Sequence, residues 1–247
     1  MNNINLLKYE IKRMIISKKY LYMILILIAF TYDSLTRLVI GGYYGTAPFS
    51  EWTYTFFIQL ISSLVMSIMI FMMTNIFNEK ELRARKILFS APIPQSKYYM
   101  LKIAGLVVTF ILTALVPIIM SFIYYKVLFD YSQFIIFGKY IIWFLIPTFI
   151  FLLGVGMVLG KTSSNLLYGL IPMAFLLGIM NTSSILPLWL DIFGQHFFEM
   201  STFAELFGRT SQNISFDLAS DFIYSRLVFI FLGIILLVYT CFKREKE

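Results

Sequence analysis

The chain has 247 residues, of which 60% are hydrophobic and only 13% are charged. Soluble domains carry about 25% charged residues, so this composition excludes an ordinary soluble fold and indicates a membrane protein. The net charge of +7 is typical of basic loops on one side of a membrane, and we do not expect nucleic-acid binding.

The first 19 residues predict an amphipathic helix. Apolar residues recur there at spacings of three and four, while Lys8, Lys12 and Lys19 fall mostly on other faces. Such a helix lies in the headgroup layer of a membrane and would form an elbow before the first span. The same basic residues also fit a plain topology signal, and the two interpretations are compatible.

Six apolar runs follow, each with about the 20 residues that a helix needs to cross the hydrocarbon core. They are continuous rather than alternating, which favours helices over the strands of a barrel. We therefore predict an all-α membrane protein, with six transmembrane helices in a single transmembrane domain over residues 1–247. The expected spans are Tyr20–Ile40, Thr53–Phe77, Tyr99–Tyr125, Phe134 or Tyr140 to Gly160, Ser164–Pro187 and Phe222–Phe242.

The basic residues are divided unequally between the two sides of these spans. Fifteen of the 20 lysines and arginines fall on the side that holds both termini and the loop 78–98. The positive-inside rule therefore predicts that this side is cytoplasmic. Isoleucine-, phenylalanine-, lysine- and asparagine-rich usage hints at a low-GC bacterium, so we expect the bacterial plasma membrane. Segment 188–221 would lie outside, where its aromatic residues favour dipping into the outer leaflet or capping a pathway.

The loop 78–98 carries many charges between two apolar runs. Two glutamates each precede an arginine by four positions, an order that favours a short helix. These pairs are Glu79 with Arg83 and Glu81 with Arg85. Pro92 and Pro94 would end that helix. One interpretation is a coupling helix that fits a cleft on an ATPase; the other is a solvated loop that only follows the positive-inside rule.

The arrangement resembles the permease subunit of type-2 ABC exporters. That family places a glutamate, a leucine-containing segment, a proline and a basic residue between spans two and three. The matching residues here are Glu79, Glu81, Lys86, Ile87, Leu88, Pro92, Pro94 and Lys97. The amphipathic start, the six spans and the long outer segment before span six extend the resemblance over the whole chain. The family commonly has a Gly-Thr pair where Ala84 and Arg85 stand here.

The resemblance implies a two-component transporter. Two permeases, identical or close paralogues, would pair in the lipid membrane and dock on two ATP-binding subunits. ATP and magnesium would be bound by those subunits, so we do not expect this chain to be an enzyme or to hold a cofactor. The residues implied in docking are Glu79, Glu81, Arg83, Arg85, Ile87, Leu88 and Pro92. The apolar spans fit export of an amphipathic or hydrophobic cargo, such as a peptide toxin, a bacteriocin or a drug.

A second charged feature lies near the outer end of the first expected span. Asp33 and Arg37 are four positions apart, so they share a helix face and could pair. Charges in a membrane segment are functional candidates. They could line a transport pathway, or they could simply lie among the outer headgroups.

Other functions find less support. The sequence Gly160-Lys161-Thr162 resembles the end of a phosphate loop, but Val155 stands where the loop needs glycine. A single histidine, His196, cannot supply the two ligands of a zinc protease. Gly156 and Gly160 instead predict close helix packing. A proton-coupled carrier needs a titratable group at mid-bilayer, and none is evident. The main alternative is a stand-alone immunity or sensor protein that binds a peptide without ATP.

Overall fold

The computed structural model describes residues 3–42, 46–79, 81, 83, 94–180, 185–198 and 218–243. Within these ranges the chain is helical and contains no β-strand, which confirms the all-α prediction. The α-helices are α1 (Asn3–Ile15), α2 (Lys18–Ser34), α3 (Glu51–Thr74), α5 (Gln95–Phe129), α6 (Gly138–Thr162), α7 (Ser164–Ile179) and α9 (Ser220–Phe242). The shorter elements are the π-helix η1 (Leu35–Val39) and the 3₁₀ helices η3 (Phe134–Phe137) and η4 (Leu188–Leu190).

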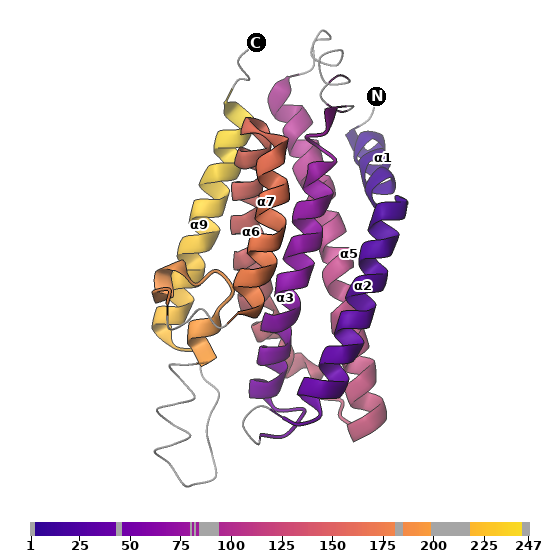
Figure 1. Cartoon of the computed structure of the whole chain (residues 1–247), viewed down its shortest axis with the longest axis vertical. Coiled ribbons are helices and arrows are strands. Elements are labelled where there is room, and N and C mark those ends of the chain that lie inside the picture. Colours follow the sequence, from indigo (N-terminus) through magenta and orange to yellow (C-terminus); the bar gives the residue numbers. More distant parts are fainter. Residues whose placement is uncertain are drawn as a thin grey trace.

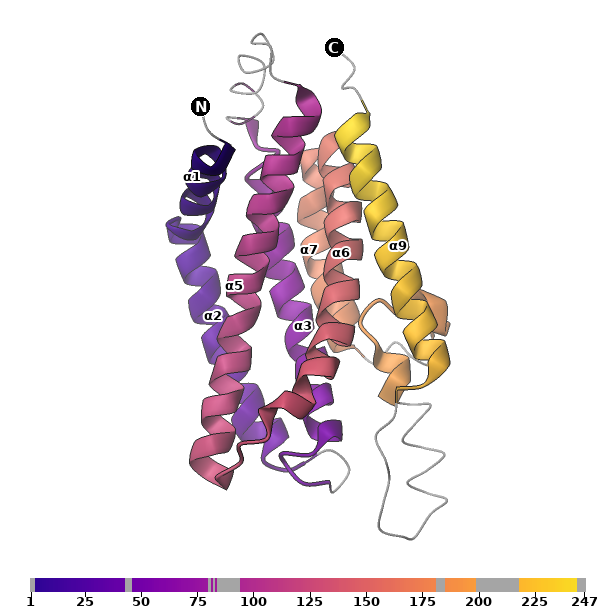
Figure 2. The same cartoon turned by 180° about the vertical axis from the view of Figure 1, so that it is seen from behind.

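The long helices run side by side in one bundle (Figures 1 and 2). Helix α1, the end of α3, the start of α5 and the last turn of α9 lie at the same end, which we call the α1 end. The segment 185–198 lies toward the opposite end, beside the start of α9. The described parts nearest the two termini therefore lie at the same end of the bundle.

In the described part of the chain, five helical stretches are long and apolar enough to cross a membrane, which indicates a multi-pass membrane protein. They are Lys18–Val39, Glu51–Thr74, Gln95–Phe129, Phe134–Thr162 and Ser220–Phe242. Each overlaps one of the expected spans closely, and the third is the longest at 35 residues. The apolar runs of the sequence, each of about 20 residues, therefore located these five helices well.

The fifth expected span, 164–187, is different. Helix α7 has 16 residues and ends at Ile179, because Met180 takes an extended backbone that stops the helical hydrogen bonds. A helix of that length extends about 24 Å, less than the hydrocarbon core of about 30 Å. The prediction of a full-length helix over this range is therefore wrong, although α7 packs within the bundle against α3 and α6.

Helix α3 forms the centre of the bundle. It packs against α2, α5, α6 and α7, and nearly all of its side chains are buried. Its buried serine hydroxyls bond to carbonyls of its own preceding turn, as Ser62 does to Gln59. Gln59 also donates to the carbonyl of Gly178 on α7 at 2.9 Å. These bonds satisfy polar groups that would otherwise be costly in an apolar interior.

Glycines allow three helices to approach closely. A Cβ atom at Gly233 of α9 would lie 2.5 Å from the backbone oxygen of Ile150 on α6, and one at Gly154 would lie 2.7 Å from the oxygen of Gly233. A side chain of α3 and one just after its end fill the space beside Gly156 and Gly160, where a Cβ would clash with Met73 and with Phe77. The predicted close packing at these last two glycines is confirmed.

Candidate functional site: an ionic cluster at the α1 end

A group of charged side chains joins α1, α5 and the start of the loop between α3 and α5. We call it the elbow cluster, and its members are Glu10, Arg13, Glu81, Tyr98 and Lys102. Lys102 Nζ lies 2.5 Å from Glu81 Oε1 and 2.9 Å from Glu10 Oε2. Arg13 lies 2.7 Å from Glu81 Oε2 and 3.1 Å from Glu10. The hydroxyl of Tyr98 donates to Glu81 at 2.9 Å.

Helix spacing explains why these residues meet. Tyr98 and Lys102 are one turn apart on α5, and both point to the same side because a helix repeats every 3.6 residues. Helix α1 packs on α5 beside position 105, where a Cβ in place of the glycine hydrogen would make ordinary van der Waals contact with Met14 at 3.6 Å. Met14 is buried in this contact. The packing of α1 on α5 thereby fixes the place of Glu10.

The charges of the elbow cluster balance, with two acids and two bases. Lys102 keeps only 3% of its side-chain surface exposed, so it depends on both carboxylates for compensation. Burial by itself would raise the pKa of Glu81. The hydrogen bonds from Lys102 and Arg13 outweigh burial and lower that pKa from 4.5 to about 2. Glu81 is therefore ionised across the physiological pH range.

The two glutamates of the charged loop face different surroundings. Glu79 pairs with Arg83 at 3.6 Å, and both side chains are more than four-fifths exposed. Glu81 instead points into the elbow cluster, with 11% of its side chain exposed. Residues 79, 81 and 83 are helical, while Arg85, Ile87, Leu88 and Pro92 lie outside the described residues. The docking role of all seven residues stays a prediction.

Pro94 occupies the cap position that begins α5. Whether it also ends the loop helix stays a prediction, because residues 84–93 lie outside the described residues. Its backbone is extended, with φ −65° and ψ 135°. Proline favours helix starts because it lacks an N–H that needs a partner there.

The pair Asp33 and Arg37 is far from the elbow cluster. Arg37 Nε lies 2.6 Å from Asp33 Oδ1, so the spacing led to the expected ion pair. Both side chains are more than half exposed, and Arg37 belongs to η1 at the opposite end of the bundle. Their role in a transport pathway stays a prediction.

A second polar contact at the α1 end joins α5, α6 and α9. Lys161, in the last turn of α6, donates to the carbonyl oxygen of Thr240 at 3.0 Å and to that of Lys243. Its ammonium also lies 4.6 Å from the ring centre of Tyr99. A cation at the end of a helix stabilises the unpaired carbonyls there. Lys161 thus binds the end of α9.

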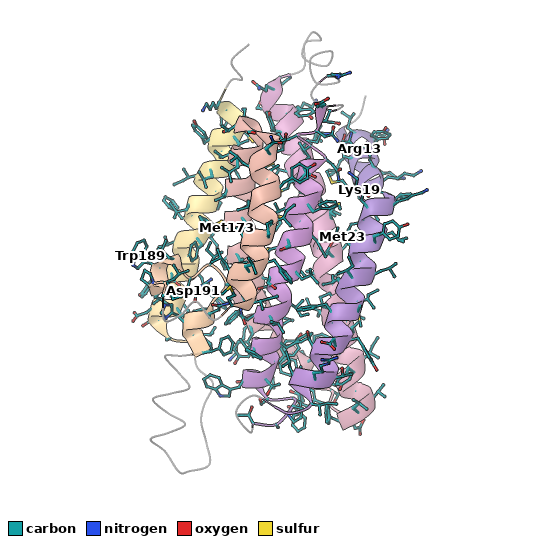
Figure 3. All side chains as sticks on the ribbon, viewed as in Figure 1. Arg13, Lys19, Met23, Met173, Trp189 and Asp191 are labelled. Atoms are coloured by element: carbon teal, nitrogen blue, oxygen red, sulfur yellow. The ribbon has the colours of Figure 1, made fainter. Side chains whose placement is uncertain are left out.

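A buried arginine holds the segment 185–198 at the end of the bundle opposite the α1 end. Arg226 of α9 has no exposed surface, and it donates to the carbonyl oxygens of Ile192, at 2.7 Å, and of Asp191. Its guanidinium also lies between the rings of Phe222 and Phe229. We call Arg226 and Asp191 the outer anchor, and Figure 3 shows Asp191 far from Arg13 of the elbow cluster.

Asp191 extends the outer anchor into the segment. Its carboxylate lies 4.0 Å from Arg226 and accepts backbone N–H groups of Gly194 and His196 at 2.8 and 2.7 Å. Gly194 has φ +83°, a conformation that favours glycine. The ring of His196 bonds to the carbonyl of Leu186. These contacts fold the segment back against α9 at the end of the bundle opposite α1, and its expected place outside the cell stays a prediction.

Sequence reasoning missed Glu10, Arg13 and Lys102 as partners of Glu81, and it missed Arg226 with Asp191. One signal was present: Glu10 and Arg13 are three apart, and Glu10 is the only acid among the first 19 residues. Among the described residues, no group of histidine, cysteine and acidic side chains could hold a metal ion. Comparison of the chain with protein-family models, curated proteins and solved structures finds no match.

Proposed function

We propose that this chain is the membrane-spanning permease subunit of an ABC exporter in a bacterial plasma membrane. In this proposal α7 is a sixth crossing, the α1 end is cytoplasmic and the loop 78–98 contains the coupling helix. A separate subunit binds ATP and magnesium and hydrolyses ATP. Two copies of the permease, or this chain and a close paralogue, enclose the path of an amphipathic or hydrophobic cargo such as a peptide.

The observation that carries the proposal is that the two loop glutamates, Glu79 and Glu81, point in different directions, one into solvent and one into the bundle. Glu79 and Arg83 are exposed beyond the end of α3, where a soluble partner could bind them. Glu81 is bound to Arg13 of α1 and Lys102 of α5. A partner that moves the loop would therefore pull on two helices at once. That is the mechanical property that a coupling loop needs.

In this proposal the elbow cluster transmits movement of the loop to α5. Charge-assisted hydrogen bonds are short and strong, so the cluster moves as a unit rather than breaking when the loop is displaced. Helix α5 has 35 residues and reaches the opposite end of the bundle. Movement of the loop would thus pass along α5 to the outer side. Asp33 and Arg37, exposed on the outer part of the bundle, remain candidates for contact with cargo or with the second permease.

Co-purification tests the docking claim. The tagged protein is co-expressed with a candidate ABC ATPase from the same genome, and the complex is isolated in mild detergent. We expect Ile87→Asp and Leu88→Asp to lose the ATPase and ATP-driven export, while Ile135→Asp, an exposed apolar position at the opposite end, retains both. Full retention of the ATPase and of export by the two loop variants would overturn the claim.

The same purified protein distinguishes the exporter from the alternative function. A stand-alone immunity or sensor protein would bind a peptide with no ATPase present and would show no ATP-dependent transport after reconstitution. An ATPase among the co-purifying proteins, with export that needs its hydrolysis, is expected for the exporter. Transport by Asp33→Asn and Arg37→Gln, compared with the unmutated protein, then decides whether that pair belongs to the cargo path.

A further inference from the structure

The exposed surface of α1 and of the start of α2 carries three lysines that form no ion pair with any described acid. Lys8 and Lys12 share one face of α1 because they are four positions apart, and Lys18 follows at the start of α2. All three are exposed, and no ion pair forms at them among the described residues. We call these three residues the basic elbow face.

Other charged groups at this end are already engaged. Arg13 and Lys102 belong to the elbow cluster, and Lys161 binds the carbonyls at the end of α9. Lys19 lies over the ring of Phe71, with its ammonium 5.8 Å from the ring centre. Figure 3 shows Lys19 where α1 meets α2. An exception is Lys97, which is exposed at the start of α5 and not on α1 or α2. The three lysines of the basic elbow face give that face a local charge of +3.

Among the described residues, no acid on a neighbouring element pairs with these lysines. In the described part of α1 and α2 the acids are Glu10 and Asp33. Glu10 bonds to Lys102 on the side that faces α5, and Asp33 pairs with Arg37 at the far end of α2. Glu79, at the same end as the lysines, pairs with Arg83. An external anion is therefore the partner that the charge of this face fits.

Apolar side chains alternate with the lysines. Tyr9 and Ile16 are 63% and 70% exposed, and Tyr22, one turn after Lys18, is 61% exposed. Exposed aliphatic and aromatic groups beside lysines suit the boundary between lipid headgroups and acyl chains, where a basic amphipathic helix lies. A soluble anion would leave these apolar groups in water.

We propose that the basic elbow face binds the headgroups of anionic phospholipids in the leaflet around the α1 end. The lysines contact lipid phosphates, while Tyr9 and Ile16 insert at the acyl boundary. This binding is independent of ATP-driven transport and would hold α1 against the membrane in either function. Each lysine near an anionic surface contributes about 1 kcal/mol, equivalent to about fivefold in affinity.

The test measures lipid binding to the purified full-length chain. Short-chain phosphatidylglycerol or phosphatidylcholine is titrated in detergent, and bound lipid is counted by native mass spectrometry. We expect a preference for phosphatidylglycerol in the unmutated protein. The triple variant Lys8→Gln/Lys12→Gln/Lys18→Gln should bind phosphatidylglycerol at least about tenfold more weakly.

Two further variants keep the result specific. Lys97→Gln/Lys126→Gln/Lys139→Gln removes the same charge from exposed positions off the elbow and should keep the preference. Lys8→Arg/Lys12→Arg/Lys18→Arg keeps the charge on the elbow and should also keep it. Equal binding of both lipids by the unmutated protein, or an equal loss in the off-elbow variant, would refute the proposal. So would displacement of phosphatidylglycerol by inorganic phosphate at matched ionic strength, which would identify a soluble anion as the ligand.

Discussion

The ammonium of Lys102 lies 2.5 Å from the carboxylate of Glu81, although the two residues are 21 positions apart in the chain. The bond crosses from the first turns of α5 to the segment that follows α3, and Arg13 reaches the same carboxylate from α1. Three parts of the chain therefore meet at one side chain. The predictions below start from this contact and move to the opposite end of the bundle.

Removing the charge of Glu81 should destabilise the protein. Glu81→Gln leaves Lys102 almost fully buried with one carboxylate instead of two, and a hydrogen bond to a charged group is worth about 1.5–3 kcal/mol. We expect a loss of about 2 kcal/mol, measured by thermal unfolding in detergent. Glu79→Gln is the matched control, because its pair with Arg83 is exposed and such pairs contribute about 0–1 kcal/mol. Equal melting temperatures for the two variants would contradict this prediction.

The contribution of Glu81 should depend on pH in the acidic range. Its pKa is lower in the folded protein, at about 2, than the ordinary 4.5. A lowered pKa gives stability that is fully present above pH 4.5 and is lost as the pH falls through about 2. The stability difference between the unmutated protein and Glu81→Gln should therefore be constant above pH 5 and shrink between pH 4.5 and 2. A difference that grows on acidification would reverse the assigned direction of the shift.

Loss of Arg226 should release the outer segment. Arg226→Met removes the donor to two backbone carbonyls and leaves the Asp191 carboxylate buried without its cation, a change that costs about 3 kcal/mol. We expect faster proteolysis within residues 185–198 and a lower melting temperature. Arg37→Met removes an arginine from an exposed pair and serves as the control. Unchanged proteolysis in Arg226→Met would show that the segment is held by its other contacts alone.

A methyl group at the crossing of α6 and α9 should be poorly tolerated. In Gly233→Ala the new Cβ would meet the backbone of Ile150 at 2.5 Å, and backbone atoms cannot move aside as a side chain can. Overpacking of this kind costs about 1–3 kcal/mol. Gly169→Ala on α7 is the control, since nothing lies within 4 Å of a Cβ there. Thermal unfolding of the two variants should separate them, with Gly169→Ala unchanged or slightly more stable.

The positions of the long helices could be predicted because membrane-length apolar runs are a property of local sequence. The limits expected for the first span, 20–40, differ by one or two residues from those observed, 18–39. The expected span ran past the end of α7 because apolar residues resume at Ile185, after the four polar residues 181–184. Helix length there depends on the backbone turn at Met180, which hydropathy alone does not report.

The partners of the charged residues were predictable only over one helical turn. The spacing of Asp33 and Arg37 was enough to pair them, and the same holds for Glu79 and Arg83. Glu81 was assigned to the loop surface because its nearest basic residues in sequence lie in the loop. Its described partners come from other helices, and their proximity follows from the packing of α1 on α5, which sequence spacing does not encode.

Tyr98 and Tyr99 are neighbours in the chain, yet one binds Glu81 and the other lies beside Lys161. Successive side chains leave a helix about 100° apart, so the first turns of α5 form the common boundary of two groups of helices. A twist of α5 about its own axis would carry both tyrosines in the same rotational sense. Rotation of α5 would therefore move its contacts with α1 and its contacts with α6 and α9 together.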